Sequence, residues 1–124
     1  MIIAIDFDGT IVENDFPRIG ALIPDAKETI NRLHDEGHYI IIWTCRHGDK
    51  LTEAVNFLSH NHIMFNAVNA DNPENTAMYG DTGRKIYAHI YIDDRNAGGL
   101  PPWKLIKEEI TQREREWLRK NAKA

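Results

Sequence analysis

The sequence predicts an α/β fold in which helices alternate with the strands of a parallel sheet. Two observations support this prediction. Apolar, isoleucine-rich stretches recur along the chain, as expected for strands that are covered on both faces. Amphipathic segments separate these stretches. Strands that alternate with helices favour a parallel sheet with right-handed crossovers.

The first strand and the first helix are separated by an irregular segment. Residues 2–7 are continuously apolar apart from one aspartate, which predicts a buried strand. Residues 10–23 are expected to form an irregular excursion or a small hairpin, because proline and glycine interrupt any regular period. A helix is expected from about Pro24, since proline suits the first turn, and it should end at Gly37.

The middle of the chain repeats this order. Residues 38–44 (HYIIIWT) predict the second buried strand. In the following segment, about 49–59, the apolar residues fall on one helical face, which predicts a helix. Residues 66–70 (NAVNA) predict a short third strand.

The last third is expected to contain a loop, a strand and a helix. Residues 71–83 are rich in Asn, Pro, Gly and Asp, which predicts a loop. Residues 88–92 (AHIYI) predict the fourth strand. A final helix is expected from about Pro102, with a tail that frays after Leu118. Four of its side chains are expected to face the core: Trp103, Ile106, Ile110 and Trp117.

Composition indicates one domain over residues 1–124, since the 124 residues are 42% hydrophobic and 27% charged. The formal net charge of −4 gives no general attraction to nucleic acid or to an anionic membrane. The single cysteine, Cys45, is expected to be a small buried residue in a reducing compartment. No apolar run approaches the roughly 18 residues of a membrane span, and the start lacks the basic region of a signal peptide, so we expect a cytoplasmic location.

Polar side chains follow three of the predicted strands. They are Asp6, Asp8 and Thr10 after the first, Thr44 and Arg46 after the second, and Asp93, Asp94 and Arg95 after the fourth. The carboxyl ends of parallel strands meet at one edge of the sheet, so we expect these residues to converge. Four carboxylates cannot all ionise at close range without a cation. Oxygen ligands favour Mg²⁺, which we expect to compensate Asp6 and Asp8 in place of a salt bridge within the protein.

Four motifs in this order resemble those of the haloacid dehalogenase-like superfamily: DFDGT at residues 6–10, an apolar strand ending in Thr44, Lys85, and YIDDR at residues 91–95. The resemblance covers roughly residues 1–96. It implies a Rossmann-like sheet with helices on both faces, and a Mg²⁺-dependent phosphatase that acts through an aspartyl-phosphate. Arg84 stands directly before Lys85, so a register one residue earlier stays open.

The resemblance also implies a role for each matching residue. Asp6 would be the nucleophile, and Asp8 the general acid and base, with its backbone carbonyl on the metal. Thr44 and Lys85 would bind the transferring phosphoryl group. Asp94, with Asp93 in support, would complete the metal site; the motif leaves open which of these two is the direct ligand.

The spacing of the motifs leaves no room for a cap domain. We therefore expect an open site that accepts a phosphorylated substrate, small or polymeric, or that a second copy of the chain covers. Arg46 is expected to contact the substrate, because an arginine fork can grip a phosphate; a solvated loop is the alternative. The order Thr44-x-Arg46 is also similar to the phosphatase domain of polynucleotide kinases, which leaves a polynucleotide-end phosphatase as a narrower alternative.

Two rival functions come from other classes. A non-catalytic phosphate-binding or regulatory module could keep the same fold, although the intact motif residues disfavour it. A phosphoacceptor receiver domain also uses acids, Thr and Lys on a parallel sheet. Its acceptor follows the third strand, whereas the second acidic pair here, Asp93 and Asp94, follows the fourth.

Overall fold

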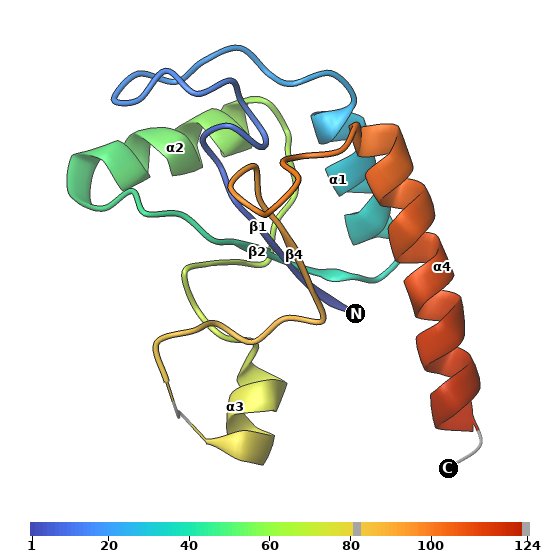
Figure 1. Ribbon diagram of the computed structural model, residues 1–124. Coiled ribbons are helices and arrows are strands. Elements are labelled where there is room, and N and C mark those ends of the chain that lie inside the picture. Colours follow the sequence, from blue (N-terminus) through green and yellow to red (C-terminus); the bar gives the residue numbers. More distant parts are fainter. Residues whose placement is uncertain (81–82, 123–124) are drawn as a thin grey trace.

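A computed structural model describes residues 1–80 and 83–122 of the chain. It contains a four-stranded parallel sheet in the order β3-β2-β1-β4 (Figure 1). The described elements are β1 (Ile2–Ile5), α1 (Ala26–Asp35), β2 (Tyr39–Ile42), α2 (Gly48–His60), β3 (Ala67–Val68), α3 (Pro73–Tyr79), β4 (Ile90–Ile92) and α4 (Trp103–Ala122). The predicted α/β class and the four predicted strands are thereby confirmed.

The strands are rich in isoleucine because both faces of the central strands are covered, and β-branched side chains pack well on a pleated sheet. Ile3 and Ile5 of β1 belong to the main core, which also contains buried residues of α1, α2 and α4. Ala4 points to the other face, where it packs with Ile86 and Ala88 in a smaller cluster. The short helix α3 lines a cavity together with the same segment but contributes no buried residue. Three helices, α1, α2 and α4, therefore pack on one face of the sheet, and α3 lies beside the segment that covers the other.

The strand order places a topological switch point at β1. The chain moves from β1 to β2 and β3 in one direction, and then returns so that β4 pairs with the other edge of β1. Ile5 at the end of β1 is in register with Ile92 at the end of β4. Segments that follow these two strands therefore start side by side, at the place where ligands bind in open α/β sheets.

Residues 10–23 form a hairpin-like excursion, which is one of the two forms that the sequence predicted. Val12 makes an antiparallel bridge to Leu22, and Glu13 N donates to Ala21 O at 2.8 Å. Among the described residues no separate cap domain is present.

The prediction of a loop throughout residues 71–83 is wrong for residues 73–79, because α3 occupies Pro73–Tyr79. Capping chemistry explains this helix: the Asn72 side chain accepts a hydrogen bond from Asn75 N at 3.1 Å, and proline stands in the first turn. Gly80 ends the helix with φ 83°. The sequence prediction counted the same Asn and Pro residues as loop formers. Asp81, expected in this loop, lies outside the described residues.

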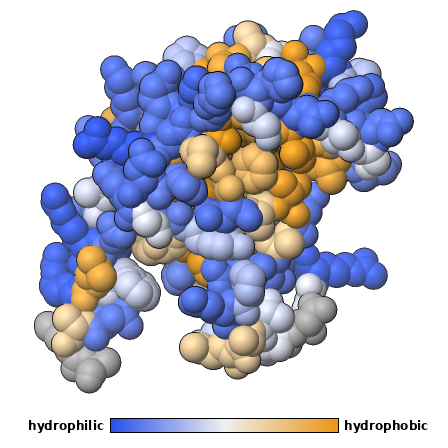
Figure 2. Space-filling view, turned by 180° about the vertical axis from the view of Figure 1, so that it is seen from behind, coloured by the Kyte–Doolittle hydropathy of each residue, from blue (hydrophilic) through white to orange (hydrophobic). Residues whose placement is uncertain are grey.

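The last helix also differs from its prediction. Trp103, Ile106 and Ile110 are buried as expected, but Trp117 is 43% exposed. Helix α4 continues to Ala122, beyond the expected end of order near residue 118. Its C-terminal half and the region of α3 project separately from the body of the molecule (Figures 1 and 2). The end of α4 therefore has no core to pack against.

The surface seen from behind in Figure 2 is mostly hydrophilic; its hydrophobic side chains gather mainly in one area of the body, and smaller patches lie on the two projecting parts at the bottom of the view. Of the described helices, none combines the length and the apolar character that crossing a membrane requires.

Candidate active site

A tight turn follows β1 and sets the positions of the acidic residues. The carbonyl oxygen of Phe7 accepts hydrogen bonds from the amides of Thr10, Ile11 and Val12 at 3.0–3.3 Å. Gly9 has φ 84°, a backbone conformation that costs little only for glycine. An added Cβ at Gly9 would lie 2.2 Å from Asp94 Oδ2, so this turn and the segment after β4 pack together without space for a side chain.

Three carboxylates meet at this point. Asp6, Asp93 and Asp94 each offer an oxygen atom, and these atoms all lie within 4.8 Å of one another; we call these three residues the carboxylate cluster. Thr10 Oγ1 lies 3.2 Å from Asp6 Oδ2 and 3.3 Å from Asp94 Oδ1. It also accepts a hydrogen bond from the Asp94 amide at 3.0 Å. The predicted convergence of the first and fourth strand ends is thus confirmed.

The electrostatics of the carboxylate cluster favour a bound cation. Burial, the hydrogen bond to Asp94 and the charge of Asp93 raise the pKa of Asp6 from 3.8 to about 7. Such a shift means that the negative charges are not compensated by the protein. Among the described residues, no lysine, arginine or histidine forms an ion pair with these three carboxylates. Three carboxylate oxygens at this spacing fit a hard divalent ion such as Mg²⁺.

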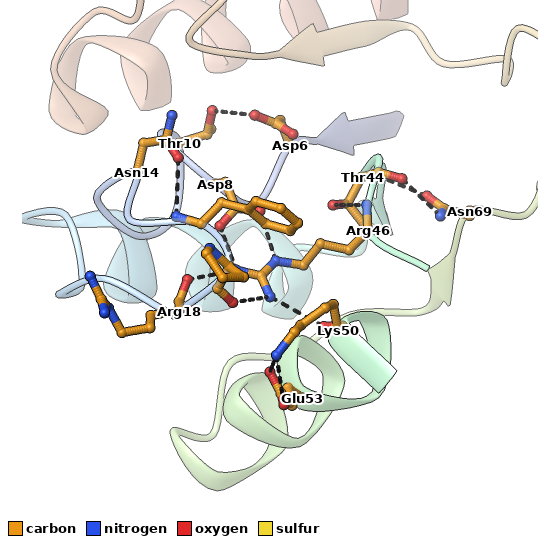
Figure 3. A network of polar contacts seen from close by, with 12 residues as sticks. Asp6, Asp8, Thr10, Asn14, Arg18, Thr44, Arg46, Lys50, Glu53 and Asn69 are labelled. Carbon is orange, nitrogen blue, oxygen red and sulfur yellow. Dashed lines mark hydrogen bonds and ion pairs between the residues drawn. The ribbon is translucent and has the colours of Figure 1, made fainter. Parts of the chain in front are cut away.

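Asp8 has a different partner. Its two carboxylate oxygens accept hydrogen bonds from Arg46 Nε and Nη2, both at 2.8 Å (Figure 3). The expectation that a metal would compensate Asp8 in place of a salt bridge is therefore wrong, because the arginine side chain neutralises this carboxylate directly. The pair joins the turn after β1 to the loop after β2.

Arg46 lies elsewhere than expected. Its side chain is 1% exposed, and its remaining N–H groups donate to the backbone carbonyls of Pro17, Arg18 and Lys50. Together with the two bonds to Asp8, these contacts use all five donors of the guanidinium. The structure therefore leaves it no free donor for a phosphate, contrary to the prediction of a substrate contact.

Thr44 lies at the carboxyl end of β2 and is fixed through its backbone. Asn69 accepts from Thr44 N at 2.8 Å and donates to Thr44 O at 2.9 Å. The Thr44 hydroxyl oxygen accepts from Arg46 N at 3.1 Å, which leaves its hydrogen free to donate. Asn69 was not predicted as a site residue. It adopts a left-handed φ of 50°, and an asparagine, which tolerates this conformation, directly after the short strand is the signal that the sequence offers.

Lys85 lines a cavity that reaches the carboxylate cluster. The cavity has a volume of about 280 Å³, and its lining includes Trp43, Lys85, Asp93 and Asn96. Lys85 Nζ lies 5.0 Å from the centre of the Tyr91 ring. Arg84 and Lys85 are both exposed, but Arg84 is not among the residues that line this cavity.

Cys45 and Trp103 lie in surroundings that the sequence did not fully predict. Cys45 is exposed, so the prediction of a buried small residue is wrong. Trp103 was predicted only as a core residue, but its Nε1 also donates to Thr10 O at 3.0 Å. A helix that begins 93 residues later in the chain therefore supports the turn that carries the acidic residues, a contact that no local pattern reveals.

Comparisons with known proteins agree with this geometry. Residues 3–97 match the family model described as haloacid dehalogenase-like hydrolase. The chain is also similar to a solved structure, described as that of a conserved protein from Bacteroides thetaiotaomicron, with 46% sequence identity, a TM-score of 0.82 and coverage of 91% of each chain. The search of curated proteins found no match.

Proposed function

Because the chain belongs to the haloacid dehalogenase-like hydrolase family, we propose that it is a Mg²⁺-dependent phosphatase that cleaves phosphate monoesters through an aspartyl-phosphate intermediate. The observation that carries this proposal is the carboxylate cluster at the ends of β1 and β4. It combines a nucleophilic group with a place for a divalent cation, at the edge of the sheet where substrates bind.

The first step is attack by Asp6 on phosphorus. A carboxylate oxygen forms the new P–O bond while the bond from phosphorus to the leaving oxygen breaks. The Thr10 hydroxyl, held by the Asp94 amide, lies 3.2 Å from Asp6 Oδ2 and can donate to it, which supports the orientation of Asp6. Thr44 and Lys85 bind the phosphoryl oxygens, and Lys85 balances their charge. The cavity beside Lys85 supports this assignment over one to Arg84.

Asp8 moves the protons. It donates a proton to the leaving oxygen in the first step. In the second step it accepts a proton from water, which attacks the aspartyl-phosphate and releases inorganic phosphate and free Asp6. The carboxylate of Asp8 is 18% exposed, so it is accessible to a leaving group and to water.

Asp6, Asp93 and Asp94 would hold the magnesium ion, with the backbone carbonyl of Asp8. When bound, the ion reduces the repulsion between a carboxylate nucleophile and an anionic phosphoryl group. Since no cap domain covers the site among the described residues, we propose a phosphorylated substrate, small or polymeric, with a second copy of the chain as a possible cover.

The test is hydrolysis of 4-nitrophenyl phosphate by the purified protein with and without Mg²⁺. We expect Mg²⁺-dependent release of nitrophenol, and a loss of about three or more orders of magnitude in Asp6→Asn. Asp15→Asn is the matched control, because Asp15 is an exposed acid whose ion pair is with Arg18, away from the carboxylate cluster. Full activity in Asp6→Asn would exclude the covalent mechanism. With the active protein, the rates of hydrolysis of sugar phosphates, nucleotides and 3′-phosphorylated oligonucleotides would distinguish small from polymeric substrates.

A further inference from the structure

We infer that Arg46 is a positioning residue, which holds the proton-carrying Asp8 in one orientation and ties it to residues 16–18 of the excursion after β1. This inference rests on the proposed function, because it assigns a task to Arg46 only if Asp8 transfers a proton. It replaces the predicted contact between Arg46 and substrate.

The contact between Arg46 and Asp8 fixes direction as well as charge. Two parallel hydrogen bonds of 2.8 Å join the planar guanidinium to both carboxylate oxygens. Such a pair restricts rotation of the carboxylate, which a single hydrogen bond does not. Each oxygen keeps a second lone pair, so Asp8 can carry a proton without leaving Arg46 entirely.

Arg46 is itself held from three other directions. Nη2 donates to Arg18 O at 2.8 Å, and Nη1 lies 3.4 Å from Pro17 O and 3.3 Å from Lys50 O. These acceptors belong to the excursion after β1 and to α2. The position of Asp8 therefore depends on residues 17 and 18 and on the start of α2, which contribute no side chain to the chemistry.

Two aromatic rings complete the surroundings of Arg46. Its Cζ atom lies 5.3 Å from the centre of the Phe7 ring and 5.1 Å from that of the Phe16 ring. Phe7 is fully buried, whereas Phe16 is 58% exposed. Phe16 thus covers the arginine on the solvent side and excludes water from the pair, which strengthens its hydrogen bonds.

A merely structural role and a positioning role predict different kinetics. A poorly oriented Asp8 slows only the reactions that need a proton on the leaving oxygen. An ester with a strongly acidic leaving group, such as 4-nitrophenyl phosphate, needs little help, whereas phenyl phosphate needs more. A displacement of about 1 Å at a catalytic group can cost roughly 100-fold in rate.

The experiment measures kcat/KM for a series of aryl phosphates with leaving groups of increasing basicity, because this constant reports the step that breaks the ester bond. In Arg46→Lys, which keeps the charge but loses the planar fork, we expect a loss of about 100-fold for the most basic leaving group and less than about fivefold for the most acidic. Arg18→Lys is the matched control, because the Arg18 side chain is 80% exposed and only its backbone carbonyl takes part. It should behave as the wild type.

An equal loss across the series in Arg46→Lys would overturn the inference and leave the proposed function standing. Failure of the wild type to hydrolyse any ester would instead remove the proposed function. Phe16→Ala tests the inference independently of how Arg46→Lys folds, because Phe16 is largely exposed. It should show the same dependence on the leaving group with a smaller loss, roughly 3- to 10-fold; an unchanged dependence would contradict the inference.

An NMR measurement, which does not depend on catalytic activity, tests whether the pair of Arg46 and Asp8 forms in solution. In the metal-free protein, the Nε–H of Arg46 should give a slowly exchanging ¹⁵N-correlated NMR signal, because it is buried and bound to Asp8. Asp8→Asn should shift this signal and speed its exchange at least about tenfold, since the charge-assisted hydrogen bond is lost. An unchanged signal would show that the pair does not form in solution.

Discussion

Gly9→Ala is the perturbation that tests the carboxylate cluster most directly. The Cβ that this change introduces would lie 2.2 Å from Asp94 Oδ2 and 2.6 Å from Asp94 Cγ. These distances are far below van der Waals contact, so the Asp94 side chain must move. Its carboxylate would then leave the three-oxygen arrangement with Asp6 and Asp93. We expect the variant to fold and to bind Mg²⁺ weakly.

Gly9→Ala is expected to have two effects, a loss of stability and a loss of Mg²⁺ affinity. The φ of 84° at Gly9 costs about 1–2 kcal/mol for a residue with a side chain. For a chain of 124 residues, this corresponds to a fall of roughly 4–8 °C in melting temperature. Displacement of Asp94 adds a loss in Mg²⁺ affinity of about 10- to 100-fold or more, because changes that only disturb the groups around metal ligands already cost that much.

Gly37→Ala separates the two effects. Gly37 has a similar φ of 93°, but nothing lies within 4 Å of an added Cβ. Both variants should lose similar stability in thermal unfolding with a chelator. Only Gly9→Ala should lose Mg²⁺ affinity in isothermal titration calorimetry. Equal Mg²⁺ affinity in the two variants would refute the assignment of Asp94 to the metal site.

Two further predictions concern stability. Trp103→Phe removes the donor to the Thr10 carbonyl and should cost about 1–3 kcal/mol in urea unfolding, whereas Trp117→Phe, at a 43% exposed position, should cost under about 0.5 kcal/mol; equal losses would argue against the hydrogen bond. The pKa of Asp6, about 7 in the fold against 3.8 without it, means that the metal-free protein holds a proton that the unfolded chain releases, so this group makes stability fall as the pH rises from about 4 to 7. Asp6→Asn should therefore raise the melting temperature with a chelator at pH 8 more than at pH 4, and saturating Mg²⁺ should reverse the gain; a gain independent of pH would contradict the shift.

The positions of the carboxylate cluster could be predicted because they depend on topology alone. A parallel sheet brings the carboxyl ends of its strands to one edge, so the sequence order of β1 and β4 and their terminal aspartates was enough to bring Asp6 and Asp94 together. The polarity of these residues at the ends of apolar strands was the decisive signal. The same rule gave Thr44 its place after β2.

The partners of Arg46 could not be predicted in this way. An arginine after a strand can point toward a ligand or into the protein, and the choice depends on where other segments offer acceptors. Here Pro17 and Arg18 present their carbonyl oxygens because the excursion folds back over the site. The helix α3 was missed for a related reason: Asn and Pro form both loops and helix starts, and only the bond from Asn75 N to Asn72 decides between them.

Asp6 and Asp8 lie two residues apart in one turn, yet their carboxylates have neighbours of opposite charge. Asp8 receives an arginine with ideal geometry, whereas Asp6 receives two further carboxylates and a hydroxyl. If Asp6 also had an arginine, the ion pair would compete with a divalent cation and occupy the lone pairs that attack phosphorus. If Asp8 stood among carboxylates, a metal would bind there and remove it from proton transfer. Under the proposed function, separate compensation of the two charges would therefore allow one turn to carry both a nucleophile beside a metal and an acid–base group outside it.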